Sequence, residues 1–196
     1  MDEKTFLCCI EAIKSSDVAI QEDAANAIAA LTEERWLPQI LYHLNDANPL
    51  VRRVMLWTLR NYTGKISYPQ FLAYLHDPDM AVREAALLLF MEGEKPACDA
   101  LVAAVSSENE ELQFSAVQAL GQFRRPEAID PLIQAAGAKN PDIRDVAILS
   151  LGVYSEKRVV PLLLASLKDE PHIRLAALEG LRGRELSPED IVTVLE

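Results

Sequence analysis

Large apolar residues recur along the chain at a nearly constant interval of 30 or 31 residues. We call six of them anchors: Ile20, Val51, Val82, Leu112, Ile143 and Ile173. A residue that is Ala in every copy except one follows four positions later, and a second large apolar residue follows eight positions later. Spacings of four and eight fall on one face of an α-helix. The pattern therefore predicts six amphipathic helices that share the same buried face.

Each of these helices has a predicted start three residues before its anchor. The residues there are Asp17, Asn48, Asp79, Asn109, Asn140 and Glu170. Five of the six have a short side chain whose oxygen can accept hydrogen bonds from the free N–H groups of the first helical turn. Proline then follows at three of these starts, where no N–H is needed.

A further apolar segment lies between consecutive capped helices, and each is long enough to form a helix. These segments are 36–44, 66–75, 96–105, 129–136 and 159–167, with 5–13 before the first capped helix. A hairpin of two short helices cannot bury its apolar side alone, so identical hairpins must stack on one another. The sequence predicts an all-α fold, a right-handed α-α superhelix or solenoid of six helical hairpins.

We expect a single domain over 1–196 that ends in a terminal half-repeat. The expected repeats are approximately 3–31, 35–62, 66–93, 96–124, 127–155 and 157–184, followed by the half-repeat 187–196.

The turn sequences carry a family resemblance. Segments 48–52, 77–83 and 140–144 read Asn-Pro-Leu-Val-Arg, Asp-Pro-Asp-Met-Ala-Val-Arg and Asn-Pro-Asp-Ile-Arg. They resemble HEAT repeats, and more narrowly the short HEAT-like repeats of the phycobilisome lyase type, whose pattern is Asp-Pro-x-x-Val-Arg-x-x-Ala with a late Leu-Gly. Leu120-Gly121 and Leu151-Gly152 match that ending, whereas Leu59-Arg60 departs from it. The resemblance covers nearly the whole chain and implies a scaffold, an adaptor, a lyase-associated subunit or, more rarely, a nucleic-acid enzyme.

Arginine follows four of the six anchors, at Arg52, Arg83, Arg144 and Arg174. One interpretation is a row that binds anions. The family resemblance implies instead a structural ladder between repeats, in which each guanidinium pairs with acidic residues of the inter-repeat turns. Candidate acceptors for this ladder are Asp46, Asp77, Asp142 and Asp169.

By the same resemblance, the positions two and six residues after each anchor line the concave surface. Here the central repeats have large apolar residues, which we call the apolar stripe: Trp57, Leu88, Phe114, Leu149 and Leu175. Arg53 and Arg60 lie near one end of it. An exposed apolar stripe marks a binding surface, and a basic or amphipathic protein segment is the expected ligand. Tight curvature or a slipped helix phase would bury these side chains instead.

Composition limits the classes of partner. Half of the residues are apolar and the formal net charge is −11, which opposes binding to nucleic acid and favours basic or apolar partners. The number of cysteines is odd, and no disulfide framework is apparent among Cys8, Cys9 and Cys98. The N-terminus lacks the features of a secretory signal, and no apolar run reaches the roughly 18 residues of a membrane span. We expect a soluble, cytoplasmic protein without a cofactor.

Candidate catalytic chemistry is sparse. His43, His76 and His172 are spread over different repeats without a third ligand nearby, and no phosphate-binding glycine motif is present. We therefore expect no catalytic residue and no metal site. Two enzymatic alternatives remain open through the resemblance. One is a subunit of a bilin lyase system that handles a tetrapyrrole, and the other is a HEAT-like DNA glycosylase with Trp57 for stacking and Asp145 as its carboxylate, although the acidic charge disfavours the latter.

Overall fold

The computed structural model describes residues 1–195, and all regular elements in that range are helices. They divide between two compact units, Met1–Ala97 and a second unit that begins at Cys98. The first unit contains α1 (Glu3–Ile13), α2 (Val18–Ala29), η1 (Glu34–Trp36), α3 (Leu37–His43), α4 (Pro49–Leu59), η2 (Arg60–Lys65), η3 (Tyr68–His76) and α5 (Met80–Glu92). Helix α6 (Glu94–Ala104) spans the change of unit. The second unit continues with α7 (Glu110–Phe123), η4 (Pro126–Ala128), α8 (Ile129–Ala135), α9 (Pro141–Leu151), η5 (Lys157–Val159), α10 (Val160–Ser166), α11 (Pro171–Leu181) and α12 (Pro188–Leu195).

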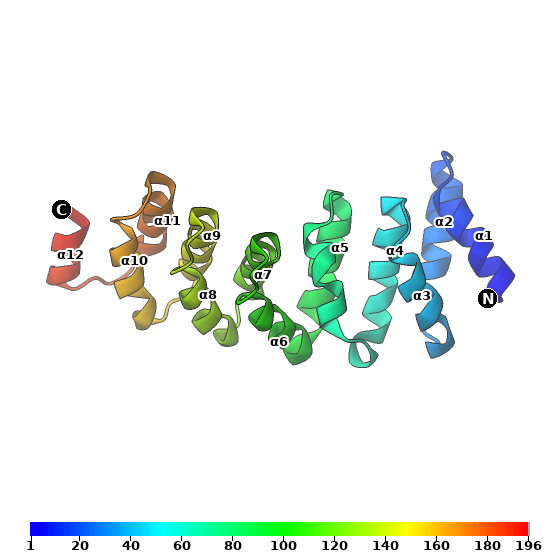
Figure 1. The fold of residues 1–196 in the computed structure, drawn as a ribbon, viewed down its shortest axis with the longest axis horizontal. Helices are drawn as coiled ribbons and strands as arrows, with labels where there is room; N and C mark the ends of the chain where they lie inside the picture. The colour runs from blue at the N-terminus through cyan, green and yellow to red at the C-terminus, as the bar shows by residue number, and fades with distance from the viewer. Residues whose placement is uncertain (196) are drawn as a thin grey trace. The chain divides into compact units, whose positions relative to one another are not determined.

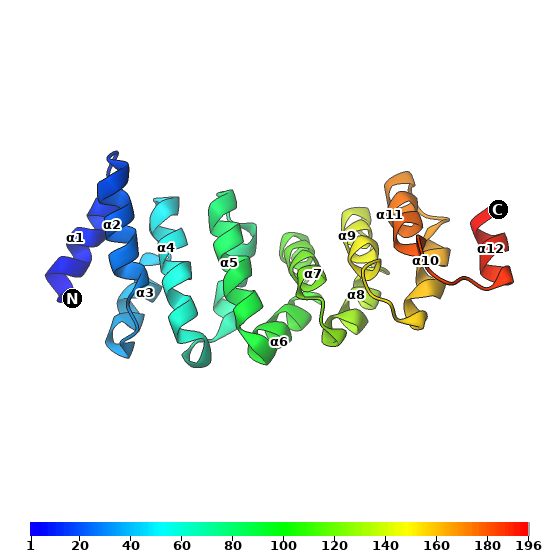
Figure 2. The same ribbon diagram turned by 180° about the vertical axis from the view of Figure 1, so that it is seen from behind.

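Consecutive helices in each unit form hairpins, and the hairpins stack. The capped helices lie side by side: α2 contacts α4 and α4 contacts α5 in the first unit, and α7, α9 and α11 form a row in the second (Figures 1 and 2). Their hairpin partners pack against them, α3 on α4, η3 on α5, α8 on α9 and α10 on α11. These contacts confirm the predicted all-α fold of stacked helical hairpins.

The core of each unit follows the period. The residues four and eight positions after every anchor are all buried, and so are the anchors Val51, Val82, Ile143 and Ile173. Ile20 is half exposed and Leu112 is partly exposed. Each fully buried Leu or Ile side chain contributes about 1.5–3 kcal/mol through the removal of apolar surface from water. The helix phase is therefore the predicted one, and it is not slipped.

Five of the six predicted N-caps form the expected hydrogen bonds. The carboxylate of Asp79, for example, accepts from the backbone N–H groups of Ala81 at 2.9 Å and Val82 at 3.1 Å. Asp17, Asn48, Asn109 and Asn140 cap their helices in the same way. Glu170 makes no side-chain cap, because its extra methylene places the carboxylate too far from the first turn for the short Asp or Asn geometry.

The segment 66–75 differs in form from the expected α-helix. It forms the 3-10 helix η3, in which Tyr68, Phe71 and Leu75 are buried. A 3-10 helix places residues three apart directly above one another, and the rings of Tyr68 and Phe71 meet edge to face with their centroids 6.4 Å apart. Both aromatic residues are thus packed into the core. An α-helical turn would offset them by about 60°, whereas the 3-10 turn aligns them.

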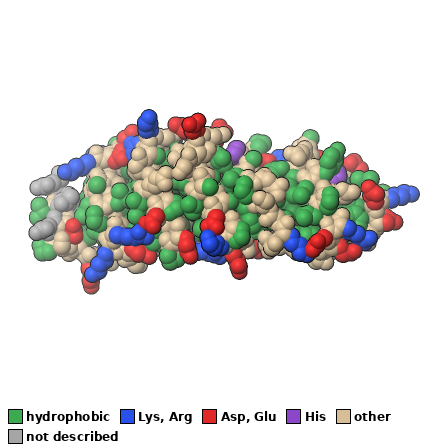
Figure 3. All heavy atoms as spheres, turned by 60° about the horizontal axis from the view of Figure 1, so that its bottom comes forward, with side chains coloured by type: hydrophobic (Ala, Val, Ile, Leu, Met, Phe, Trp, Pro, Cys, Tyr) green, Lys and Arg blue, Asp and Glu red, His purple; other side chains and the backbone are tan. Residues whose placement is uncertain are grey.

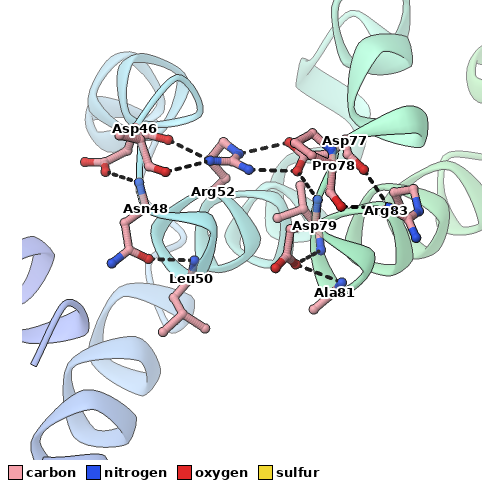
Figure 4. Close-up of polar contacts among 11 residues, drawn as sticks. Asp46, Asn48, Leu50, Arg52, Asp77, Pro78, Asp79, Ala81 and Arg83 are labelled. Carbon is pink, nitrogen blue, oxygen red and sulfur yellow. Dashed lines mark hydrogen bonds and ion pairs between the residues drawn. The ribbon is translucent and has the colours of Figure 1, made fainter. Parts of the chain in front are cut away.

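A polar clamp joins the turns of neighbouring repeats in the first unit (Figure 4). Arg52 donates from Nε and Nη2 to the two carboxylate oxygens of Asp77 at 2.9 and 2.7 Å, and from Nη1 to the carbonyl oxygens of Asp46 and Ala47. Asp77 also accepts from the N–H of Asp79 at 2.9 Å. The guanidinium therefore satisfies acceptors in its own turn and in the next turn at once.

The second unit repeats this clamp. Arg144 donates two hydrogen bonds of 2.8 Å to Asp169, and it also binds the carbonyl oxygens of Ala138 and Lys139. Gln113, at the position equivalent to Arg144, donates to a carbonyl of its own turn, that of Val105, at 2.8 Å.

The first repeat has a glutamine where the clamp has an arginine. Gln21 follows the anchor and donates to the carbonyl oxygens of Ile13 and Ser15. The carboxylate of Asp46, in the next turn, is met by the ammonium group of Lys14 at 3.1 Å. A lysine from the first helix thus neutralises the acid that an arginine neutralises elsewhere.

Helices α9 and α11 approach each other closely at two glycines. A Cβ atom added to Gly152 would lie 2.9 Å from the Cα of Gly180, which is shorter than side chains tolerate. The late Leu-Gly of this repeat therefore has a packing reason, since only glycine permits the two backbones to meet there.

We expect Arg52→Met to destabilise the first unit by about 3 kcal/mol, because it leaves the buried carboxylate of Asp77 without its counter-ion. Arg174→Met is the matched control: this arginine is exposed and forms no ion pair with residues 1–195, so a change within about 0.5 kcal/mol is expected. Urea unfolding followed by circular dichroism measures both. Equal losses in the two variants would contradict a structural clamp.

The clamps also predict an acid limit to stability. Burial raises the pKa of the Asp77 carboxyl, but hydrogen bonds from Arg52 and the N–H of Asp79 outweigh burial and hold the pKa below its usual value. The hydrogen bond from Arg144 lowers the pKa of Asp169. These groups bind fewer protons folded than unfolded, so their stabilisation is present above the unfolded pKa of about 4 and is lost as the pH falls through the folded pKa.

We therefore expect the free energy of unfolding to fall as the pH decreases below about 4, with a smaller fall in Asp77→Asn. Urea unfolding at a series of pH values tests this. An identical acid dependence in wild type and variant would show that Asp77 is not one of the groups responsible.

Gly152→Ala should destabilise the second unit by about 1–3 kcal/mol, since the added methyl group must push α9 and α11 apart. Gly64→Ala is the control, because a Cβ atom there would meet nothing within 4 Å. Its unfolding free energy should stay the same or rise by up to about 1 kcal/mol. Thermal or urea unfolding that ranks the two variants in the opposite order would refute the close approach.

Candidate partner-binding surface

The residues of the apolar stripe project outward from the capped helices. In the first unit the exposed fractions of Trp57 on α4 and Leu88 on α5 are 38% and 41%, and in the second unit those of Leu149 on α9 and Leu175 on α11 are 51% and 59%. Phe114 on α7 is partly exposed. The side chains are therefore accessible rather than buried. Because the stripe is divided between the two units, we describe each part by itself.

The first-unit part combines an aromatic ring with a cation. The Cζ atom of Arg53 lies 4.8 Å from the centroid of the Trp57 ring, within the range of a cation–π contact. Arg60, at the end of α4, instead donates to the carboxylate of Glu92, with one bond of 2.7 Å from its Nε. Arg60 is thus already paired within the chain, whereas the Arg53 guanidinium is held by stacking.

The second-unit part contains a shallow groove between α7 and α9. Its volume is about 300 Å³, and it is lined by Phe114, Asp142, Asp145, Val146 and Leu149. Phe114, Val146 and Leu149 are its apolar lining residues, and the two lining carboxylates are partly or fully exposed. The groove therefore combines an apolar contact area with negative charge.

Helix α11 extends the apolar surface of the second unit. Leu175 belongs to the stripe. Leu178, five residues after the anchor Ile173, is exposed as well. Sequence reasoning missed Leu178 because it counted only positions two and six, although neighbouring positions on a helix face also reach the surface. It also took Asp142 as a possible acceptor for the arginine row, whereas the structure places this residue at the groove.

The arginines that follow the anchors occupy different surroundings. Arg52 and Arg144 form the clamps, and Arg83 donates to the carbonyl oxygens of Asp77 and Pro78 at 2.7 and 3.1 Å. Arg174 is exposed and has no ion pair with residues 1–195. Three of the four guanidinium groups are therefore engaged with the protein's own oxygens, and the four do not present a uniform row of free donors.

Other charged side chains pair on the surface. Figure 3 shows basic and acidic side chains next to one another at several places. Arg158 and Asp130 form an exposed ion pair, with 2.5 Å between Nη1 and Oδ1. Exposed pairs of this kind contribute at most about 1 kcal/mol each. They lower the number of unpaired charges that a ligand could meet.

Groups suited to catalysis or metal binding are dispersed. Within residues 1–195, no three His, Cys, Asp or Glu side chains come close enough to hold a metal ion. His43 lies with its Nδ1 3.9 Å from Asp46, and burial lowers its pKa although Asp46 opposes that effect. Cys8 is exposed, Cys9 is partly exposed and Cys98 is buried, and none of these three forms a disulfide. None of the described helices is both long and apolar enough to cross a bilayer.

Known structures share this architecture. Drosophila melanogaster Mini spindles TOG3 superposes with a TM-score of 0.57 at 16% sequence identity, over 92% of this chain and 96% of that one. Human deoxyhypusine hydroxylase in complex with glycerol gives a TM-score of 0.47 at 15% identity, over 92% of this chain and 73% of that chain. A designed armadillo repeat protein in complex with the peptide (KR)4 gives 0.46 at 14% identity, over 92% and 98%. At these identities the likeness to Mini spindles TOG3 shows the fold alone.

Sequence comparison identifies the family. No curated protein matches the chain. The family model for HEAT repeats matches residues 8–90 and 98–182, which together make up most of the sequence. The match is to HEAT repeats in general, so the narrower phycobilisome lyase type stays a prediction. The repeated turns, the stacked hairpins and this match agree, and the chain belongs to the HEAT-repeat family.

Proposed function

We propose that this chain is a non-catalytic scaffold or adaptor, and that it binds a segment of a partner protein on the outward face of its capped helices. The observation that carries the proposal is the groove between α7 and α9, where the aromatic ring of Phe114 and the half-exposed Leu149 offer apolar contact area. Large apolar side chains that stay exposed on a rigid element are typical of binding hot spots.

The charge around this groove favours a basic or amphipathic segment. Asp142 and Asp145 flank the apolar residues, and the chain as a whole has a net charge of −11. A partner helix or extended strand with one large apolar residue beside Lys or Arg would bury the former on Phe114 and pair the latter with a carboxylate. Complementary charge also accelerates the encounter and selects against acidic segments.

The rigidity of the platform supports binding without rearrangement. Helices α7 and α9 are in contact, and both have buried residues on their other faces, including Ala116, Ala147 and Ile148. The side chains of the groove are therefore mounted on packed helices and lose little conformational freedom when a ligand binds.

The two enzymatic alternatives gain no support from this site. A tetrapyrrole has anionic propionate groups and DNA has phosphates, and both would meet the carboxylates of Asp142 and Asp145. Asp145 itself lies beside Phe114 and Leu149 rather than in a basic setting. Cysteines without a disulfide fit a reducing compartment, and we infer that the protein acts in the cytoplasm.

Replacement of both Trp57 and Phe114 by Ala should reduce partner capture at least tenfold, because it removes the two aromatic contacts while it leaves the buried face intact. A second variant, Leu149→Glu, adds charge to the groove without creating a cavity and should have the same effect. Capture is measured by affinity purification from the native organism with quantitative mass spectrometry.

Tyr42→Ala is the control, since Tyr42 is an exposed aromatic residue on α3, outside the proposed surface. Circular dichroism melts establish that each variant remains folded. Retention of the same partners by the Trp57/Phe114 and Leu149 variants would refute the proposal.

A further inference from the structure

Arg53 on α4 differs from the clamp arginines Arg52 and Arg144 in its hydrogen bonding. Its side chain forms no hydrogen bond or ion pair with residues 1–195, and its buried Nε lacks an acceptor. Its neighbour Arg52, by contrast, donates to Asp77 and to two carbonyl oxygens. A buried donor without an acceptor destabilises the free protein. An arginine kept in this state is a candidate for pairing with an acceptor from outside the chain.

The Trp57 ring holds the guanidinium in place. With Cζ 4.8 Å from the ring centroid, the stacked arrangement restricts the long side chain. Arg53 as a whole is partly exposed, although its Nε is buried. A planar guanidinium that is held by stacking can donate two parallel hydrogen bonds from its edge, a geometry that matches a carboxylate.

Acidic neighbours make a multiply charged anion a poorer ligand here than a single carboxylate. Helices α2 and α5 both contact α4, and the positions equivalent to Arg53 on these two helices are Glu22 and Glu84, both exposed. A multiply charged anion, such as a phosphate or a nucleic-acid strand, would be repelled by them. The exposed rings and methyl groups of Trp57 and Leu88 add apolar contact area at equivalent positions of α4 and α5.

We propose that the first unit recognises the carboxylate of an Asp or Glu side chain in a partner protein, with Arg53 as its counter-ion and Trp57 and Leu88 as the contact for an adjacent apolar residue. The inference rests on the proposed scaffold function and extends it. The groove of the second unit selects a basic residue, whereas this surface selects an acidic one. The two units therefore differ in the charge that they accept.

A phage-displayed library of random 12-residue peptides tests the inference without a known partner. It is selected in parallel on wild type, Arg53→Met, the double variant Asp142→Asn/Asp145→Asn, and the control Arg174→Met. Methionine keeps an apolar stem on Trp57 and removes the charge. Wild type and the control should enrich peptides with Asp or Glu next to a large apolar residue, and Arg53→Met should lose this class alone.

The outcomes separate this inference from the proposed function. Enrichment of basic apolar peptides that depends on Asp142 and Asp145, without an acidic class that depends on Arg53, overturns the inference and leaves the scaffold function standing. No enrichment on any variant overturns both.

A matched pair of synthetic peptides gives the affinity. The chain has two tryptophans, and Trp36 is buried, so a Trp36→Phe background leaves Trp57 as the only source of tryptophan fluorescence. An enriched acidic peptide should bind roughly tenfold more tightly than its copy with Gln in place of Glu, as expected for a charge-assisted hydrogen bond. Arg53→Met should remove that difference. Equal affinity of wild type for both peptides, or a difference that persists in Arg53→Met, would overturn the assignment.

Discussion

The stacking of apolar helix faces is the constraint on which the rest of this structure depends. Helices such as α3 and α8 have seven residues each, too few to be stable alone in water. They form because the residues four and eight positions after each anchor on the adjacent helices are buried against them. Every other feature, including the caps, the clamps and the outward residues, occupies positions that this packing leaves available.

Polar interactions then determine how the turns between hairpins are arranged. The apolar faces are similar from repeat to repeat, and the contacts between them are non-directional. The paired hydrogen bonds of Arg52 to Asp77 and of Arg144 to Asp169 are directional. Each arginine also donates to carbonyl oxygens of its own turn. Buried or partly buried ion pairs add modest net stability compared with apolar packing, but the loss of one partner is severe. The clamps therefore contribute more to the geometry of the turns than to the total stability.

Much of this could be read from the period. The six capped helices, five of the caps and the buried face follow from residue spacing, because these are local properties of a helix. The form of η3 could not be foreseen, since it depends on how the rings of Tyr68 and Phe71 pack against the remaining core. The pairing of Lys14 with Asp46 was equally hidden, because it joins residues from different repeats at unrelated positions. For the candidate site, the exposed stripe was predicted, but the stacking of Arg53 on Trp57 and the place of Asp142 required side-chain geometry.

The clamp has a direction along the chain, because the arginine belongs to one repeat and the carboxylate to the next. Arg144 meets Asp169, whereas Gln113, at the preceding equivalent position, is followed in the next turn by Ala138. If the repeats were exchanged, an arginine would face an alanine and an aspartate would face a glutamine, even though the apolar faces would still fit. The polar residues of the turns thus fit the native order of the repeats. A duplicated or exchanged repeat keeps its clamp only where donor and acceptor change together, or where another cation meets the carboxylate as Lys14 meets Asp46.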